Sequence, residues 1–455
     1  KVTVTIGGQS YTTVLDAAGN WSVGVPASVI SGLSDGSVTV TAAVTDAAGN
    51  TGTGTHSVTV DTGLPSVNFN AISDDNVLNA VEKGQDLNVS GTSANLAEGT
   101  VVTVTLNGKN YTATTAADGT WSLTVPAADL AGLGQANYTL NATATNGVGN
   151  SVSNSANLLV DTALPTVTIN TVAGDNVINA AEVAAGQTIS GSVANAEAGN
   201  TVTVMIGGNS YTATVQSDLS WSVSVPESVL TALGNGDLTV SATVTNGHGN
   251  TGTGERDITI DANLPGLRVD TVAGDDVINS IEHGQNLIVT GSSDGLAAGT
   301  TLTVTLNGKT YAASVLVDGT WSAAIPAADV GALAAGTVTV TVAGQSAAGN
   351  PVTISHDVTV DLTAVAISID TISADDVINA AEKGADLVLS GSTSNVEENQ
   401  TVTVTFGGKS YTATVDADGN WAATVPSADL AGLKDGDASV QVSVTNAHGN
   451  SASAG

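Results

Sequence analysis

The chain has 455 residues and a formal net charge of −33, from 42 Asp and Glu against 9 Lys and Arg, so its negative field excludes nucleic acid and anionic membranes as partners. Only 11% of the residues are charged and 41% are apolar, which excludes a disordered acidic tail. The absence of Cys excludes disulfides, thiolate metal sites and Cys nucleophiles.

The first residues, 1–5, alternate like a strand and lack the pattern of a signal peptide. No apolar run approaches the roughly 18 residues that suggest a membrane span. We therefore expect the interior of a longer polypeptide, with no membrane insertion in this fragment.

Four residue types mark a repeat of 100 residues, and an Asp marks each junction. These positions are Trp21, Trp121, Trp221, Trp321 and Trp421; Tyr11, Tyr111, Tyr211, Tyr311 and Tyr411; Pro26, Pro126, Pro226, Pro326 and Pro426; Asn50, Asn150, Asn250, Asn350 and Asn450; and Asp61, Asp161, Asp261 and Asp361.

The sequence of each repeat has the pattern of short strands joined by tight turns. Residues 301–306 alternate Thr with aliphatic residues, the period of a half-buried strand. Asn307-Gly308 suits a two-residue hairpin turn, and Asp318-Gly319 marks a second turn before Trp321. At 218–220 this glycine is replaced by Leu219, which weakens the prediction of a tight turn there.

A short segment after each Pro, such as 127–133, predicts one helical turn that bridges two strands. The pattern predicts an all-β fold of tandem immunoglobulin-like β-sandwich domains, with about seven strands each, arranged as an elongated rod. In one repeat the strands are expected near 66–69, 86–91, 101–106, 110–115, 120–125, 137–145 and 152–160.

The repeat also predicts the domain boundaries. Residues 1–61 form a repeat lacking its N-terminal strands, and residues 362–455 form one lacking its C-terminal strand. The three complete repeats are 62–161, 162–261 and 262–361. The missing strands are either outside this fragment or supplied by another chain.

The recurring aromatic residues have two interpretations. Rings at a fixed phase could form a row of sugar-binding platforms, because aromatic faces stack on other rings. One large apolar residue per small domain is also what a core anchor requires. With aromatic residues at only 3% of the chain, we interpret the Trp as core.

An acidic segment follows each junction Asp, as in Asp75-Asn76-Val77-Leu78-Asn79-Ala80-Val81-Glu82. Its side chains offer only oxygen ligands, which suit Ca²⁺ better than Mg²⁺ or zinc. The segment therefore predicts calcium at the interdomain junctions. The candidate ligands are Asp61, Asp75, Asn76, Asn79, Glu82, Asp161, Asp175, Asn176, Asn179, Glu182, Asp261, Asp275, Asp276, Asn279, Glu282, Asp361, Asp375, Asp376, Asn379 and Glu382.

In the alternative interpretation, Asp caps a short helix, Asn79 satisfies backbone groups and Glu82 is a solvated charge. Recurrence at every junction favours calcium, because carboxylates brought together without a cation repel one another. Bound metal would then stiffen each joint. The loop ending at the Asn of the preceding repeat could lie at the same end.

No catalytic site is predicted. None of the five His occurs in every repeat, so we interpret them as surface or loop residues. No Gly-x-Ser-x-Gly elbow or phosphate-binding loop occurs. Nothing distinguishes one repeat as a catalytic unit, and the sequence predicts that the chain is not an enzyme.

The repeat resembles a known family. Val-Thr-Val-Thr-x-Asn/Gly-Gly-x-x-Tyr, then Asp-Gly-x-Trp, Val-Pro-x-x-x-Leu and Val-Thr-Asn-x-x-Gly-Asn, is similar to the bacterial Ig-like repeats of very large Gram-negative surface adhesins. The likeness covers nearly the whole chain and is greatest to BapA-type biofilm-associated proteins.

The resemblance implies type I secretion, as for an RTX-type adhesin, and an extracellular position on the bacterial cell surface. It implies a structural extender stiffened by calcium that supports cell adhesion and biofilm formation. Its partners would be the adjacent repeats and a host or abiotic surface. The alternative is that the repeats themselves bind a glycan or self-associate with an identical protein on another cell.

Overall fold

A computed structural model describes residues 1–455, and most of the regular structure is strand. Residue contacts divide the chain into two units, 1–170 with 189–223 and 240–256, and 171–188 with 224–239 and 257–455. This division passes through the third repeat, so the two units do not coincide with whole repeats. The longest helix, α4 (Glu227–Leu233), has seven residues, so no helix could cross a membrane.

The second repeat, 62–161, consists of two sheets. One has the strand order β10-β7-β5 and the other β6-β12-β11-β8-β9. Neighbouring strands are antiparallel except β6 and β12, which run parallel. The elements are β5 (Ser66–Phe69), β6 (Val77–Leu78), the 3-10 turn η1 (Glu82–Gly84), β7 (Leu87–Ala94), β8 (Val101–Leu106), β9 (Lys109–Thr114), β10 (Thr120–Val125), α2 (Ala127–Leu130), β11 (Ala136–Thr145) and β12 (Ser151–Val160).

Alternate residues of the two sheets form one core between them. Val102 and Val104 of β8 and Leu140 of β11 are fully buried, and they belong to the same cluster as Val89 of β7 and Val125 of β10. The residues between them along each strand face outward, as the two-residue period of a strand requires. The structure thus confirms the predicted all-β, immunoglobulin-like fold, in which only the two-residue strand β6 was not foreseen.

The Trp is the centre of this core. Trp121 is 2% exposed and its ring lies against Gly91 of the facing strand. A Cβ atom on Gly91 would meet the ring at 2.4 Å and the backbone oxygen of Asn68 at 1.9 Å. Only glycine fits there, and the same pairing recurs 100, 200 and 300 residues later. The interpretation of Trp as a core residue agrees with this burial.

The predicted turns form with positive φ. Asn107 and Gly108 have φ values of 48° and 78°, as a two-residue hairpin turn requires. The turn at 218–220 also forms, because Asp218 Oδ1 accepts the Ser220 N–H at 3.0 Å. Leu219 therefore adopts a φ of 65°, a conformation that costs an L-residue with a side chain about 1–2 kcal/mol.

Residues 1–61 form one four-stranded sheet, in the order β2-β1-β3-β4. The residues equivalent to β10, at 20–25, form no strand, because these residues have no counterpart of β7 to pair with. Trp21 is consequently 42% exposed. The elements are β1 (Val2–Ile6), β2 (Gln9–Thr13), α1 (Ala27–Ile30), β3 (Gly36–Thr45) and β4 (Thr51–Val60).

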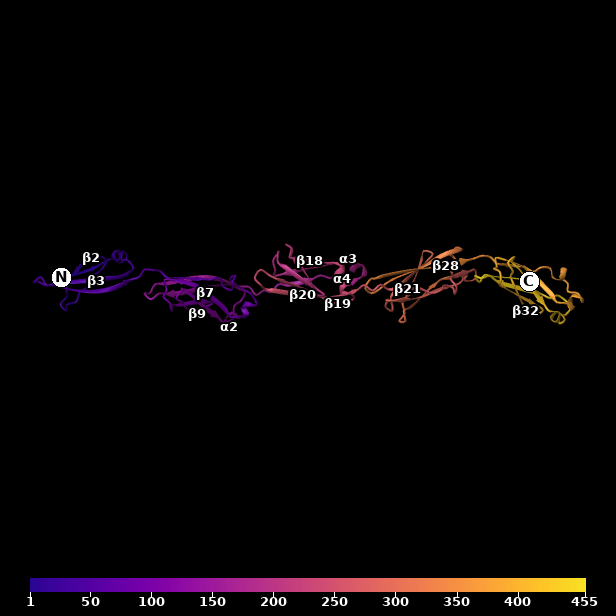
Figure 1. The fold of residues 1–455 in the computed structure, drawn as a ribbon, viewed down its shortest axis with the longest axis horizontal. Helices are drawn as coiled ribbons and strands as arrows, with labels where there is room; N and C mark the ends of the chain where they lie inside the picture. The colour runs from indigo at the N-terminus through magenta and orange to yellow at the C-terminus, as the bar shows by residue number, and fades with distance from the viewer. The chain divides into compact units, whose positions relative to one another are not determined.

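The third repeat keeps the two-sheet topology of the second. It has a longer helix, α3, in place of the 3-10 turn, and α3 lies beside α4 (Figure 1). Its elements are β13 (Thr166–Ile169), β14 (Val177–Asn179), α3 (Ala180–Ala185), β15 (Gln187–Ala194), β16 (Thr201–Ile206), β17 (Asn209–Thr214), β18 (Ser220–Val225), α4 (Glu227–Leu233), β19 (Gly236–Thr245) and β20 (Thr251–Asp261).

The fourth repeat has the same two sheets again. Its elements are β21 (Gly266–Val269), β22 (Val277–Asn279), η2 (Glu282–Gly284), β23 (Leu287–Asp294), β24 (Thr301–Leu306), β25 (Lys309–Ser314), β26 (Thr320–Ile325), α5 (Ala327–Val330), β27 (Gly336–Gln345) and β28 (Pro351–Asp361).

The fifth repeat has a three-stranded and a four-stranded sheet. Its last strand, β35, has four residues and is shorter than β28, whose last three residues pair with β22, and no counterpart of β22 forms. The elements are β29 (Ala366–Ile367), η3 (Ile372–Ala374), η4 (Glu382–Gly384), β30 (Leu387–Ser394), β31 (Thr401–Phe406), β32 (Lys409–Thr414), β33 (Asn420–Val425), α6 (Ser427–Leu430), β34 (Val440–Thr445) and β35 (Ser451–Ala454).

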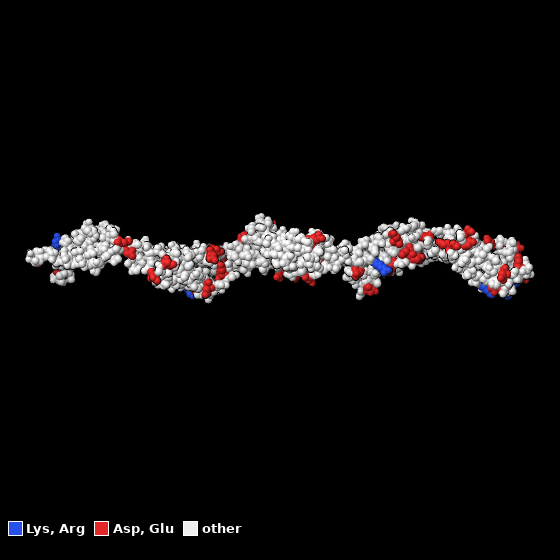
Figure 2. Space-filling model, viewed as in Figure 1, with Lys and Arg blue, Asp and Glu red and all other residues white.

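Acidic side chains dominate the charged surface. On the face drawn in Figure 2, Asp and Glu appear at many places and Lys and Arg at few, as the composition requires.

Candidate functional site at the joints between repeats

The acidic segment of each repeat is organised by its own side chains. Asp75 Oδ1 accepts the N–H of Val77 at 2.8 Å, and Asn76 Oδ1 accepts the N–H of Ile72 at 3.0 Å. Asn76 has a φ of 65°, in the left-handed region that Asn and Asp tolerate. The equivalent residues of the next three repeats make the same hydrogen bonds.

Asn79 and Glu82 cap the turn that follows. Asn79 Oδ1 accepts the N–H of Glu82, and Glu82 Oε2 accepts the N–H of Asn79, each at 3.0 Å. This reciprocal pair is a capping box, and it satisfies two backbone donors at the start of the turn. The pair recurs as Asn179 with Glu182, Asn279 with Glu282 and Asn379 with Glu382.

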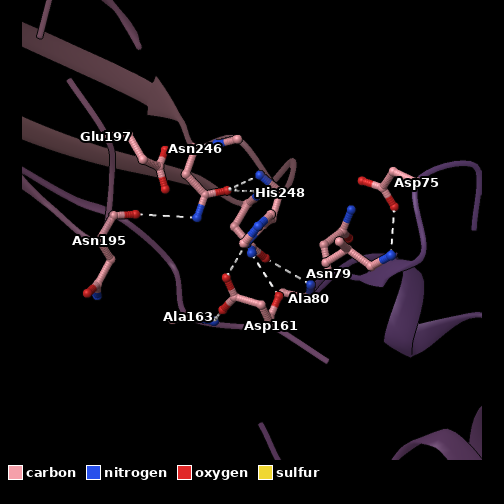
Figure 3. Close-up of polar contacts among 12 residues, drawn as sticks. Asp75, Asn79, Ala80, Asp161, Ala163, Asn195, Glu197, Asn246 and His248 are labelled. Carbon is pink, nitrogen blue, oxygen red and sulfur yellow. Dashed lines mark hydrogen bonds and ion pairs between the residues drawn. The ribbon is translucent and has the colours of Figure 1, made fainter. Parts of the chain in front are cut away.

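The capped turn lies against the start of the following repeat. The parallel pairing of β6 with the end of β12 puts Leu78 beside Asp161, whose N–H donates to the Leu78 oxygen at 3.1 Å. From the next repeat, Asn250 accepts the N–H of Ala80 and donates to the backbone oxygen of Asp161, both at 2.9 Å. Figure 3 shows Ala80 and Asp161 close together at this joint. One Asn side chain thus joins two repeats.

This grouping differs from the one that chain order suggested. The sequence placed segment 75–82 with Asp61, which precedes it, whereas the structure places it at the opposite end of its repeat, with Asp161. The physical reason is that β5 carries the chain from one end of the sandwich to the other before the segment begins. The loop that meets it accordingly belongs to the following repeat, not to the preceding one.

The Asn contact is repeated along the chain. Asn350 joins Ala180 to Asp261, and Asn450 joins Ser280 to Asp361, at distances between 2.7 and 3.1 Å. Asn250, Asn350 and Asn450 are at most 1% exposed. Asn50 has no repeat before it within residues 1–455 and is exposed, so the burial of this Asn depends on the neighbouring repeat.

Two of the four joints carry a second contact. His248 Nδ1 lies 2.6 Å from Asp161 Oδ2, and His448 Nδ1 lies 2.6 Å from Asp361 Oδ2. His248 lowers the pKa of the Asp161 carboxyl below its ordinary value. Hydrogen bonds from Thr363, and after them the one from His448, lower the pKa of Asp361 to about 2. The carboxylates of Asp161 and Asp361 are therefore ionised at neutral pH.

The candidate metal ligands have the oxygen donors that calcium prefers, but their side chains do not converge on one point. All are oxygen donors, and Asp75 and Glu82 each use one carboxylate oxygen for a backbone N–H. No three His, Asp or Glu side chains come together in a group that could hold a metal ion. Figure 3 shows Asp75 apart from Asp161, with Asn79 and Ala80 between them. A cation at the joint would therefore use backbone or water oxygens beside these side chains.

Comparison with known proteins places the chain. A family described as bacterial Ig-like domain matches residues 1–62. A Ca²⁺-stabilized adhesin that helps an Antarctic bacterium reach out and bind ice is 34% identical over 87% of this chain and 97% of its own structure, with a TM-score of 0.38. A bacterial immunoglobulin-like domain from the M. primoryensis ice-binding adhesin is 32% identical over 22% of this chain and its whole length, with a TM-score of 0.19.

The chain belongs to the bacterial Ig-like repeats of adhesins. A tetra-tandem repeat in the extending region of a large adhesion protein is also similar, with 28% identity over 86% of this chain and 99% of the other and a TM-score of 0.32. A search of curated proteins found no match.

The Ig-like repeats contain one further cluster that sequence reasoning missed. Lys109 and Tyr111 of β9 both contact Asp129 of α2, at 2.6 and 3.1 Å. The cluster recurs at 309, 311 and 329 and at 409, 411 and 429. The first repeat has neither the Lys nor the Asp, because Gln9 and Val29 stand at their positions. The third repeat also lacks both, with an Asn in place of the Lys and a Val in place of the Asp. The Lys and the Asp are thus present together or missing together in every repeat, and this covariation in the sequence could have revealed the contact.

The His contacts in these repeats were also missed. The five His were interpreted as surface or loop residues. His248 and His448 do lie in loops, and each also contacts a junction carboxylate. His356 contacts Asp276 at 2.7 Å within its own repeat, and His283 contacts the backbone oxygen of Leu333 at 2.9 Å. The available signal was that His248 and His448 share one phase of the repeat, each two residues after an Asn (Asn246 or Asn446).

Proposed function

We propose that this region is the extender of a secreted bacterial cell-surface adhesin, that calcium stiffens it at the joints, and that it supports cell adhesion and biofilm formation as in BapA-type proteins. The observation that carries the proposal is the Asn contact, which recurs from repeat to repeat at the same place. A contact of this kind holds neighbouring repeats in a defined geometry, which is what an extender needs. In this role the chain is not an enzyme.

Similarity to the extending region of a large adhesion protein supports the extender role, and similarity to a Ca²⁺-stabilized adhesin supports the calcium. Calcium would be held by the carboxylate oxygens of Asp75 and Glu82 that do not accept a backbone N–H, and by the carboxylate of the junction Asp. The equivalent residues of the other repeats would do the same. It would neutralise part of the charge of −33 and draw the repeats together.

Scattering and melting of the whole chain test this function. Four to five repeats placed end to end would span about 100 Å or more, from strands of about seven residues at ~3.3 Å each. We expect calcium to raise the melting temperature and to increase the maximum dimension relative to chelator. Equal values in calcium and in chelator would remove calcium from the proposal, and a maximum dimension well below 100 Å would remove the extender.

The alternative is that the repeats themselves bind a glycan or a second copy of the chain. The sheet edges that β9, β25 and β32 form begin with a Lys, a charge that opposes pairing between edge strands. Sedimentation of the chain and its binding to a glycan array separate the two functions. Association in solution or binding of a sugar would favour the alternative.

A further inference from the structure

We infer that the chain alternates between two kinds of joint: those at Asp161 and Asp361 are held by a histidine clamp that needs no metal ion, and those at Asp61 and Asp261 lack it. His248 and His448 form the clamp. The reference to calcium rests on the proposed function, whereas the clamp itself rests on the contacts between repeats.

The clamp joins side chains of two consecutive repeats. At the second joint, Asp161 Oδ1 accepts the N–H of Ala163 at 3.0 Å and Oδ2 lies 2.6 Å from His248 Nδ1. Because an ionised carboxylate can only accept, Nδ1 of the imidazole is the donor. A neutral imidazole with its hydrogen on Nδ1 makes this bond, so the clamp requires neither a metal ion nor a second proton on the ring.

The other two joints have no side chain that could replace His248. The equivalent positions are Val148, which is 54% exposed, and Ala348, which is 6% exposed. Asp61 Oδ1 accepts only the N–H of Gly63, at 3.0 Å, and Asp261 Oδ1 accepts from Asn263 alone. No side chain of the next repeat neutralises either carboxylate.

The surrounding loop is the same in both kinds of joint, so the histidine is the variable part. The loop that holds Val148 closes by the Asn146 N–H to Asn150 oxygen bond at 2.9 Å. The loop that holds His248 closes by the equivalent bond, also at 2.9 Å. A His248→Val variant therefore keeps a loop that this chain already folds.

The absence of Cys allows spin labels to be placed at chosen sites in the whole chain. Cysteines introduced in pairs at the exposed positions Thr112, Thr212 and Ala312 sit at equivalent places in the edge strands β9, β17 and β25. The pair 112–212 spans a histidine joint and the pair 212–312 spans a joint without one. Double electron–electron resonance gives the width of each distance distribution in calcium and in chelator.

We expect chelator to broaden the 212–312 distribution and to leave the 112–212 distribution unchanged. In chelator, His248→Val should broaden 112–212 alone. His283→Lys is the matched control, because Lys83 and Lys383 make the same backbone contact in other repeats, and it should change neither pair.

The possible failures are distinguishable. If His248→Val leaves the 112–212 width unchanged in chelator, or if chelator broadens both wild-type pairs equally, the clamp is overturned. If no wild-type pair responds to chelator, the calcium in the proposed function fails while His248→Val still decides the clamp. A Val148→His variant that narrows a 12–112 pair in chelator would support the clamp by transferring it.

Discussion

Replacing Gly291 by alanine tests the account of the core most directly. A Cβ at this position would lie 2.0 Å from the backbone oxygen of Arg268 and 2.3 Å from Cζ2 of Trp321. One of the two atoms is backbone in the neighbouring strand β21, so a side-chain rotation cannot relieve the contact. Overpacking of a close-packed core costs about 1–3 kcal/mol, and we expect the upper end of that range.

The sign of the change in the free energy of unfolding distinguishes a steric clash from the general effect of replacing glycine by alanine. A glycine replaced where the backbone allows it stabilises a protein by about 0.4–1 kcal/mol, through the unfolded chain. Gly284 is exposed, has no atom within 4 Å of a built Cβ and has no positive φ, so Gly284→Ala is the matched control in the same repeat.

Hydrogen–deuterium exchange of the whole chain measures the effect by repeat. A loss of about 3 kcal/mol corresponds to exchange about a hundredfold faster in β23 and β26, where protection reflects opening of that repeat's core. Exchange in the fifth repeat should stay unchanged. If Gly291→Ala protects β23 as well as Gly284→Ala does, the reasoning from the Trp–Gly contact is wrong.

The remaining predictions concern one turn, one joint and one ion pair. Leu219→Gly should raise the free energy of unfolding of the third repeat by up to about 1 kcal/mol, because glycine adopts a φ of 65° without the cost to a side chain; a lower melting temperature would contradict this. Asn350→Ala should cost about 1–3 kcal/mol, because it removes a buried side chain and leaves two half-buried backbone groups without that partner, whereas Asn50→Ala at the exposed equivalent should be neutral in the same denaturant titration. Lys309, followed by Tyr311, lowers the pKa of Asp329 below 3.8, so this carboxylate contributes stability above pH 3.8 that is lost as the pH falls through the lowered value. The double variant Lys309→Asn with Asp329→Val, the pair found in the third repeat, should lose less stability than the wild type on acidification below pH 3.8, and an equal loss in acid melting curves would refute the contact.

Local patterns predicted the strands because both sheets are antiparallel and half-buried. Alternating residues such as 301–306 face the core and solvent in turn, and Asn-Gly pairs satisfy the positive φ of the hairpins. The turn at Leu219 formed without its glycine because Asp218 accepts the N–H of Ser220 and the sheets hold the strands on either side. Strand β6 was not predicted, since two residues carry no periodicity.

The joint could not be predicted from order along the chain. Segment 75–82 follows Asp61 closely in sequence, yet its contacts are to Asp161 and Asn250, 89 residues apart from each other. The sequence correctly identified which residue types recur near the joints. It could not identify their partners, because a strand that crosses the sandwich separates residues that are near in sequence and joins residues that are far apart.

By itself the sequence determined the repeat, its strands and its Trp core, because these depend on periodicity and on local backbone preference. The tertiary structure alone decided which acidic segment meets which junction Asp, and that Asn250, Asn350 and Asn450 are buried against a neighbouring repeat. It also decided that histidine reaches the junction carboxylate at two joints. Each of these contacts depends on where the ends of two separate sandwiches come together, a distance in space that spacing along the chain does not encode.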